Sequence, residues 1–179
     1  MSWRNTNNNY GRISKLFHWV LFVLITMMVI GALSTADVKG PEKAELIQTH
    51  KSLGATILIL VALRLVWRAT NPSPRQPEGT PGWMRVLALL NHCALYLLML
   101  AQPISGILMV QAHGHGVQPF GWFTWPTWVA PDKARAELFE SIHEALWIAL
   151  VTLAALHIVA AFYHHWARRD GVLRRMFAG

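Results

Sequence analysis

The chain has 179 residues, of which 54% are hydrophobic and only 14% are charged, and its mean hydropathy is +0.32. This composition excludes an ordinary soluble domain and predicts one membrane-embedded domain over residues 1–179. The net charge of +7 does not indicate a nucleic-acid partner, because the basic residues stand at the ends of apolar runs rather than on one face or in one arm.

Four apolar runs of helix length follow one another along the chain. They predict membrane-spanning helices over residues 16–33, 49–67, 86–110 and 140–165. We expect Pro103 and Gly106 to kink or thin the third helix. The runs are joined by a polar stretch (34–48), a loop rich in proline and glycine (71–82) and an aromatic segment that ends in an amphipathic turn (111–140). Such short connections favour an all-α, antiparallel four-helix bundle.

Lysine and arginine are divided unequally between the two sides of this bundle. One side collects 11 of the 16 basic residues and the other side 5. The positive-inside rule therefore predicts that both termini lie in the cytoplasm. No cleavable signal peptide is evident, because the first apolar run is long enough to span a membrane.

Two histidines of the last apolar run, His143 and His157, are separated by 14 residues. This spacing is about 40° short of four helical turns, so both imidazoles leave the same face, about 21 Å apart along the helix axis. One imidazole would then lie towards each surface of a hydrocarbon core about 30 Å thick. Imidazoles in hydrocarbon need partners, and a metal at each level is a natural one. The alternative is that backbone or hydroxyl groups satisfy them.

In an antiparallel bundle the other histidines fall at the same two levels. The outer level pairs His50 with His143, and the inner level pairs His157 with either His18 or His92. Two imidazoles on different helices are what axial ligation of a haem wedged between helices requires.

Zinc is the competing metal at these two levels. It binds four ligands, but the levels lack membrane-embedded carboxylates, and the chain has a single cysteine, Cys93. The lone cysteine also excludes an internal disulfide and a cysteine-ligated iron–sulfur centre. Haem therefore suits the ligand set better than zinc does.

Several motifs together carry a resemblance to a known family. They are RISKLFHW at His18, HKSLG at His50, NHCALYLLMLAQPISGILM around His92, PFGWF, SIHEALW at His143, ALHIVAAFYHH from His157, and DGVLRRM. With them the chain resembles the bacterial cytochrome b561 family, whose members are di-haem four-helix cytochromes of the inner membrane related to the cytochrome b subunits of nickel–iron hydrogenases.

The resemblance implies a fold and a set of ligands. It implies two haem b groups, one bound by His18 and His157 on the cytoplasmic side and one bound by His50 and His143 on the periplasmic side. It makes His92 a neighbour of a ligand or a partner of a haem propionate.

The resemblance also implies a function. Haem iron with two histidine ligands has no open position, which favours outer-sphere electron transfer. The leading hypothesis is an enzyme that oxidises superoxide, or another small periplasmic reductant, at the outer face and reduces ubiquinone. The alternative is a cytochrome b subunit that relays electrons between quinone and a partner dehydrogenase or hydrogenase. A histidine-bearing metal transporter is poorly supported, because intramembrane carboxylates are missing.

Four further residues each have a functional and a structural interpretation. Lys51 adjoins His50 and would draw an anion towards the outer haem, or it is an interfacial lysine. Gly54 would let a porphyrin approach the backbone, or it serves helix packing. Arg64 would bind a haem propionate, or lipid phosphate. His164 would bind quinone or relay its protons, or it lies among lipid headgroups.

Overall fold

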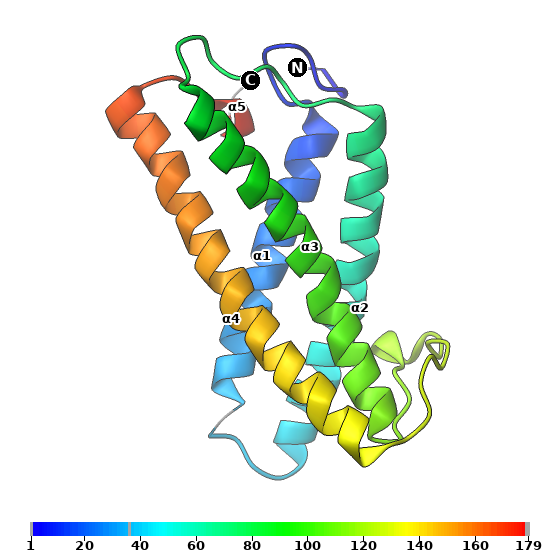
Figure 1. Ribbon diagram of the computed structural model, residues 1–179. Coiled ribbons are helices and arrows are strands. Elements are labelled where there is room, and N and C mark those ends of the chain that lie inside the picture. Colours follow the sequence, from blue (N-terminus) through cyan, green and yellow to red (C-terminus); the bar gives the residue numbers. More distant parts are fainter. Residues whose placement is uncertain (1, 36, 178–179) are drawn as a thin grey trace.

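The structure, a computed structural model, describes residues 2–35 and 37–177. Its four long helices are α1 (Arg12–Ser34), α2 (Pro41–Thr70), α3 (Gly82–Ala112) and α4 (Lys133–Tyr163). All four are long and apolar enough to cross a membrane, and the described residues contain no strand. The prediction of an all-α bundle of membrane helices is confirmed (Figure 1).

Both ends of the chain lie at the same end of the bundle, here called the terminal end, and the opposite end is the distal end (Figure 1). The terminal end also holds the α2–α3 loop and two short elements, η2 (His164–Arg168) and α5 (Arg174–Phe177). The indole Nε1 of Trp19 in α1 donates to the carbonyl of Met176 in α5 (3.1 Å). The distal end holds the α1–α2 connection and the aromatic segment with η1 (Pro119–Gly121).

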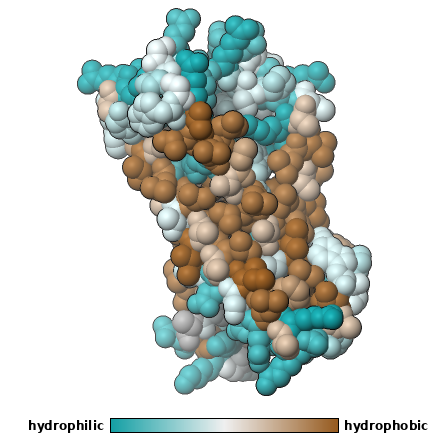
Figure 2. Space-filling model, in the orientation of Figure 1, coloured by the Kyte–Doolittle hydropathy of each residue, from teal (hydrophilic) through white to brown (hydrophobic). Residues whose placement is uncertain are grey.

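The sides of the bundle are apolar and its two ends are polar. Figure 2 shows a brown belt of hydrophobic residues between two teal ends. In the most apolar stretch of α1 and of α4 only 6% of the residues are buried within the protein, against 22% in α2 and α3. Most apolar side chains therefore face outward, where lipid rather than water covers them.

All four helices begin earlier than their apolar runs predicted, and α2 and α4 differ most. The segment expected to form an amphipathic turn makes the first turns of α4, and Asp132 caps this helix by accepting a hydrogen bond from the amide of Arg135 (2.8 Å). Pro41 stands in the first turn of α2, where its missing N–H is no loss. An apolar run marks the part of a helix that lies in hydrocarbon, and polar residues prolong the helix beyond it.

The longer helices change the position of the histidines within them. His50 and His143 fall in the first turn of the predicted ranges 49–67 and 140–165, but each lies about three turns inside its observed helix. The third helix also runs through Pro103 without interruption.

The helices pack unequally against one another. α3 packs along α4, α1 along α2, and α2 along α3. A buried cluster that includes Leu21 of α1 and Val61 of α2 joins the first two helices. Among the described residues, α4 has only sparse backbone contact with α1 and α2. The backbone of α4 therefore stands apart from these two helices, and any direct contact between them is made by side chains.

Candidate cofactor site

One pair of histidines faces each other between α2 and α4 near the distal end. His50 of α2 and His143 of α4 are half-buried, and their ring centres are 6.4 Å apart. Both line a cavity of about 660 Å³ between the helices, which is within the range of about 300–1,000 Å³ typical of ligand and cofactor pockets. The predicted outer pair is therefore brought together around a space of cofactor size.

Three histidines gather nearer the terminal end. The ring centre of His157 in α4 lies 6.3 Å from that of His18 in α1 and 5.4 Å from that of His92 in α3. Both partners that the sequence left open for His157 are thus beside it.

The ring spacings favour one of these two partners. With metal–nitrogen bonds of about 2.0 Å and about 1.1 Å from each nitrogen to its ring centre, two imidazoles that bound one iron from opposite sides would have ring centres about 6.2 Å apart. The His18–His157 and His50–His143 spacings of 6.3 and 6.4 Å match this value, whereas the His92–His157 spacing of 5.4 Å is too short. This agreement supports His18 as the partner of His157.

Two polar residues that the sequence analysis did not single out hold His143. Nδ1 of His143 lies 3.1 Å from the carbonyl oxygen of Gln102 and 3.0 Å from Oγ of Ser105, both in α3. The Gln102 amide nitrogen lies 3.1 Å from Nε2 of the same ring, and its side-chain oxygen is buried without a partner. The sequence feature that could have indicated these contacts is the presence of a Gln and a Ser on either side of Pro103 within an apolar run.

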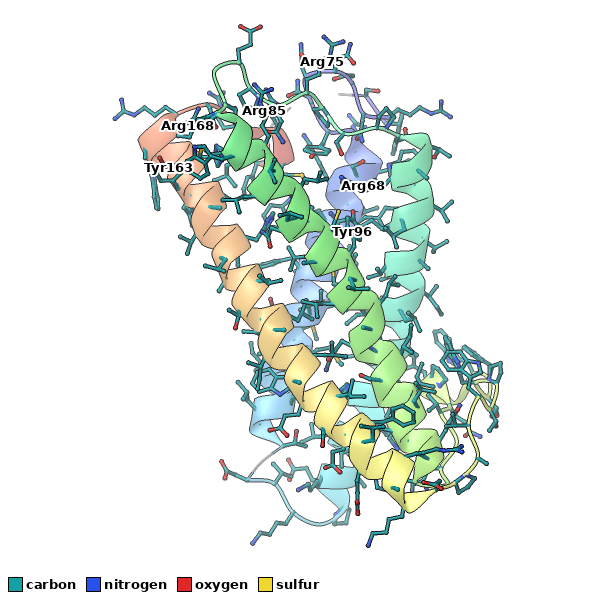
Figure 3. The ribbon with its side chains drawn as sticks, in the orientation of Figure 1. Arg68, Arg75, Arg85, Tyr96, Tyr163 and Arg168 are labelled. Carbon is teal, nitrogen blue, oxygen red and sulfur yellow. The ribbon has the colours of Figure 1, made fainter. Side chains whose placement is uncertain are left out.

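Two arginines stand next to the terminal-end histidines. Nη2 of Arg64 donates to Nδ1 of His18 (3.2 Å). The guanidinium groups of Arg64 and Arg68 lie 5.4 and 5.5 Å from the ring centre of Tyr96, and Figure 3 shows Arg68 and Tyr96 near each other in the part of the bundle towards the terminal end. Within the described part of the chain neither arginine forms an ion pair with a carboxylate. Partly buried cations of this kind favour binding of a carboxylate such as a haem propionate.

Two other predicted residues, Lys51 and Gly54, line the distal cavity. A Cβ added at Gly54 would meet only Cε of Met28, at 3.7 Å. Gly54 therefore borders open space rather than a tightly packed helix. Two acidic residues, Glu140 and Glu144, line the same cavity, so its charge is mixed.

His164 lies apart from the cluster around His157, at the terminal end, where α4 ends in the π-helical turn η2. Seven residues, or about 10 Å of helix, separate the two histidines along the chain. Arg169 adopts a left-handed conformation (φ 54°) that turns the chain back. This turn brings the carboxylate of Asp170 onto Nδ1 of His164 and Nε of Arg168, and Arg168 reaches the carbonyl of Gly79 in the α2–α3 loop.

The Asp170 contacts predict a pH-dependent contribution to stability. Burial opposes ionisation of Asp170, but hydrogen bonds from His164, the Val172 amide and Arg168 outweigh it, so the pKa of this carboxyl lies below its usual range. The stabilisation is therefore complete above the unfolded-state pKa and is lost as the pH falls through the lower folded-state pKa. We expect Asp170→Asn to cost about 1–3 kcal/mol at pH 7 and less at a pH below the unfolded-state pKa, such as pH 3. Thermal unfolding in detergent at both pH values measures this difference, and an equal cost at both would contradict it.

The arrangement fits haem better than a metal ion bound by protein ligands alone. The described residues contain no group of three or more His, Cys, Asp or Glu side chains close enough to hold a metal ion. They contain two imidazole pairs at the spacing of axial ligands, one of them around a cavity of cofactor size. A bundle of membrane helices with such pairs defines the class of membrane cytochromes b.

The comparison with known families agrees. The chain belongs to the prokaryotic cytochrome b561 family, whose family model matches residues 9–179. It is thus a multi-pass bacterial membrane protein that binds haem b and transfers electrons.

Three relatives match almost the whole chain. Cytochrome b561 homolog 2 of Escherichia coli (strain K12) is 34% identical over 181 residues, which cover 98% of this chain and 95% of that protein. Cytochrome b561 homolog 1 of the same organism is 30% identical over 172 residues, or 94% of this chain and 97% of that protein. The probable superoxide oxidase CybB of Yersinia pestis is 29% identical over 175 residues, or 95% and 96% of the two chains.

Proposed function

We propose that this protein is a di-haem oxidoreductase of the bacterial inner membrane that oxidises superoxide at the distal end and reduces ubiquinone. In this proposal the distal end faces the periplasm, and both termini lie in the cytoplasm. Two superoxide ions become two dioxygen molecules and release two electrons, and one ubiquinone takes up both electrons and two protons to become ubiquinol.

The observation that carries the proposal is the presence of two imidazole pairs at opposite ends of one bundle. His143 and His157 both belong to α4 and lie about 21 Å apart along its axis. Their partners, His50 and His18, come from the two helices that scarcely contact α4. His50 with His143, and His18 with His157, would each hold a haem b, which would supply a one-electron carrier at that level.

At the distal end the chain's residues would bind and attract the reductant. The positive charge of Lys51, one residue from His50 and on the wall of the cavity, would raise the local concentration of a small anion. Glu140 and Glu144 line the same cavity and oppose this attraction. One relative is named as a probable superoxide oxidase, which supports superoxide as the anion.

At the terminal end the residues would hold negative charge and move protons. Arg64 and Arg68, which have no carboxylate partner among the described residues, would bind haem propionates. Iron binding at Nε2 of His18 requires Arg64 to release Nδ1, since a neutral imidazole has only one lone pair to give. His164, held by Asp170, would donate a proton to reduced quinone and recover it from the cytoplasm.

The test uses the purified holoprotein in ubiquinone-containing proteoliposomes, with superoxide generated enzymatically outside. We expect the absorption bands of reduced haem b to appear and ubiquinol to form, and we expect superoxide dismutase to prevent both. Lys51→Glu is expected to slow reduction by superoxide about tenfold, because electrostatic steering contributes about 10- to 1,000-fold. The control is Lys43→Glu, which makes the same charge change in the first turn of α2 outside the cavity.

Two outcomes would contradict parts of the proposal. Reduction by superoxide without ubiquinol formation would remove the quinone half. Reduction by ubiquinol but not by superoxide would favour the other hypothesis, a cytochrome b subunit that passes electrons to a partner dehydrogenase or hydrogenase.

A further inference from the structure

We propose that the segment 102–106 of α3 positions the imidazole of His143, keeps its Nε2 unprotonated so that it has a lone pair for iron, and lowers the reduction potential of the distal-end haem. The inference rests on the two-haem part of the proposed function. It does not depend on superoxide or quinone as substrates.

The contacts of His143 determine which ring nitrogen carries the proton. The Gln102 carbonyl oxygen, 3.1 Å from Nδ1, can only accept a hydrogen bond. The hydroxyl of Ser105 donates to the same carbonyl (2.8 Å), so its Oγ, 3.0 Å from Nδ1, is also an acceptor. Nδ1 of His143 must therefore be the protonated nitrogen, and its N–H is shared between two acceptors.

The other ring nitrogen is consistent with this tautomer. The Gln102 side-chain amide donates to Nε2 of His143 (3.1 Å), which requires a lone pair on that atom. This is the lone pair that iron would use. The Gln102 amide must turn away when Nε2 binds a metal, and its side-chain oxygen, which is buried without a partner, makes no hydrogen bond that would hold it in place.

A glycine one turn further on allows the close approach of the ring. A Cβ added at Gly106 would lie 3.0 Å from Cε1 and 3.3 Å from Nδ1 of His143. Any larger residue would push the imidazole away from its two acceptors. The segment therefore supplies both the hydrogen bonds and the space that define the ring position.

These contacts affect the electronic properties of a haem ligand. A metal-bound histidine that donates its second N–H to a carbonyl becomes a stronger electron donor. A stronger axial donor favours the oxidised iron and so lowers the reduction potential. His18 differs, because the group beside its Nδ1 is not an acceptor but the guanidinium of Arg64, a donor that must move away before Nε2 can bind iron. The two haems would thus have different potentials for a structural reason that can be tested.

The first experiment is a potentiometric titration of the purified holoprotein. Ser105→Ala is expected to shift the distal-end haem to a more positive potential and to leave the terminal-end haem unchanged. The matched control is Ser34→Ala, which removes a hydroxyl that bonds only to its own helix, at the carbonyl of Ile30 (2.9 Å). Unchanged potentials for both haems in Ser105→Ala would overturn the inference.

A second variant tests the space beside the ring. Gly106→Ala is expected to weaken retention of the distal-end haem about 10- to 100-fold, the usual effect of disturbing a ligand's support. Gly31→Ala is its control, since a Cβ there meets nothing within 4 Å. Equal haem retention in the two variants would contradict the role of Gly106.

The tautomer can be measured without haem. In haem-free protein with isotope-labelled histidine, the nitrogen shifts of His143, assigned by comparison with His143→Ala, should report a protonated Nδ1 and an unprotonated Nε2. The reverse tautomer would overturn the inference. None of these measurements uses superoxide or quinone, so the proposed substrates can fail while this inference stands.

Discussion

Replacing His143 with alanine is expected to leave the purified protein with about one haem b per chain in place of two, because a bis-histidine site loses an axial ligand. His157→Ala should have the same effect on the amount of haem but should remove the other haem. The two variants are then complementary, because each keeps the haem that the other lacks, and the reduction potential identifies which haem remains. Pyridine haemochrome quantitation gives the stoichiometry, and redox titration shows which haem remains.

The matched control is His115→Ala, which removes an exposed histidine from the connection between α3 and α4 and should retain both haems. Helix content from circular dichroism, together with elution volume in detergent, distinguishes loss of one haem from failure to fold. One haem in the wild-type protein, or loss of the same haem in both variants, would contradict the assignment of two separate sites.

The second large effect concerns the partner of His157. His18→Ala is expected to remove the terminal-end haem, whereas His92→Ala is expected to retain about two haems per chain. The physical reason is the ring spacing: His18 lies 6.3 Å from His157, as axial ligands of one iron should, and His92 lies 5.4 Å away. The measurement is again haem stoichiometry with redox titration, and here each histidine variant is the control for the other.

His92 is still expected to influence the terminal-end haem. Its ring packs edge-on against His157, and its neighbour Asn91 has a buried side-chain oxygen without a hydrogen-bond partner. His92→Ala should therefore change the potential rather than the amount of haem. Loss of a haem in His92→Ala, with both haems retained in His18→Ala, would assign the axial pair to His92 and His157 instead.

The proposed electron path and the proposed proton path use different parts of the molecule. The histidine pairs lie in the interior of the bundle along α4, whereas His164 and Asp170 lie at its terminal end, where α4 ends in η2. The Arg168 side chain ties this end to the α2–α3 loop through Gly79. The terminal end is therefore a joined unit of loop, helix end and C-terminal segment, in which a change at Asp170 affects more than a single proton donor.

The sequence by itself determined the number of membrane helices, their order and the family. These properties depend on local patterns: an apolar run long enough to cross hydrocarbon, a spacing of 14 residues that returns to the same helix face, and short motifs around each histidine. The prediction of four helices is confirmed, although their ends were misplaced. The helix ends depend on capping and on polar residues outside the membrane, such as Asp132 before α4, which hydropathy does not report.

Tertiary structure decided which side chains of different helices meet. The residue pattern left His157 with two possible partners, and only the ring spacings separate His18 from His92. In the sequence, Gln102 and Ser105 are two polar residues in an apolar helix. Only the packing of α3 along α4 places them within hydrogen-bond distance of Nδ1 of His143. Contacts between helices depend on the relative rotation and depth of two rigid bodies, and no pattern within one helix contains either quantity.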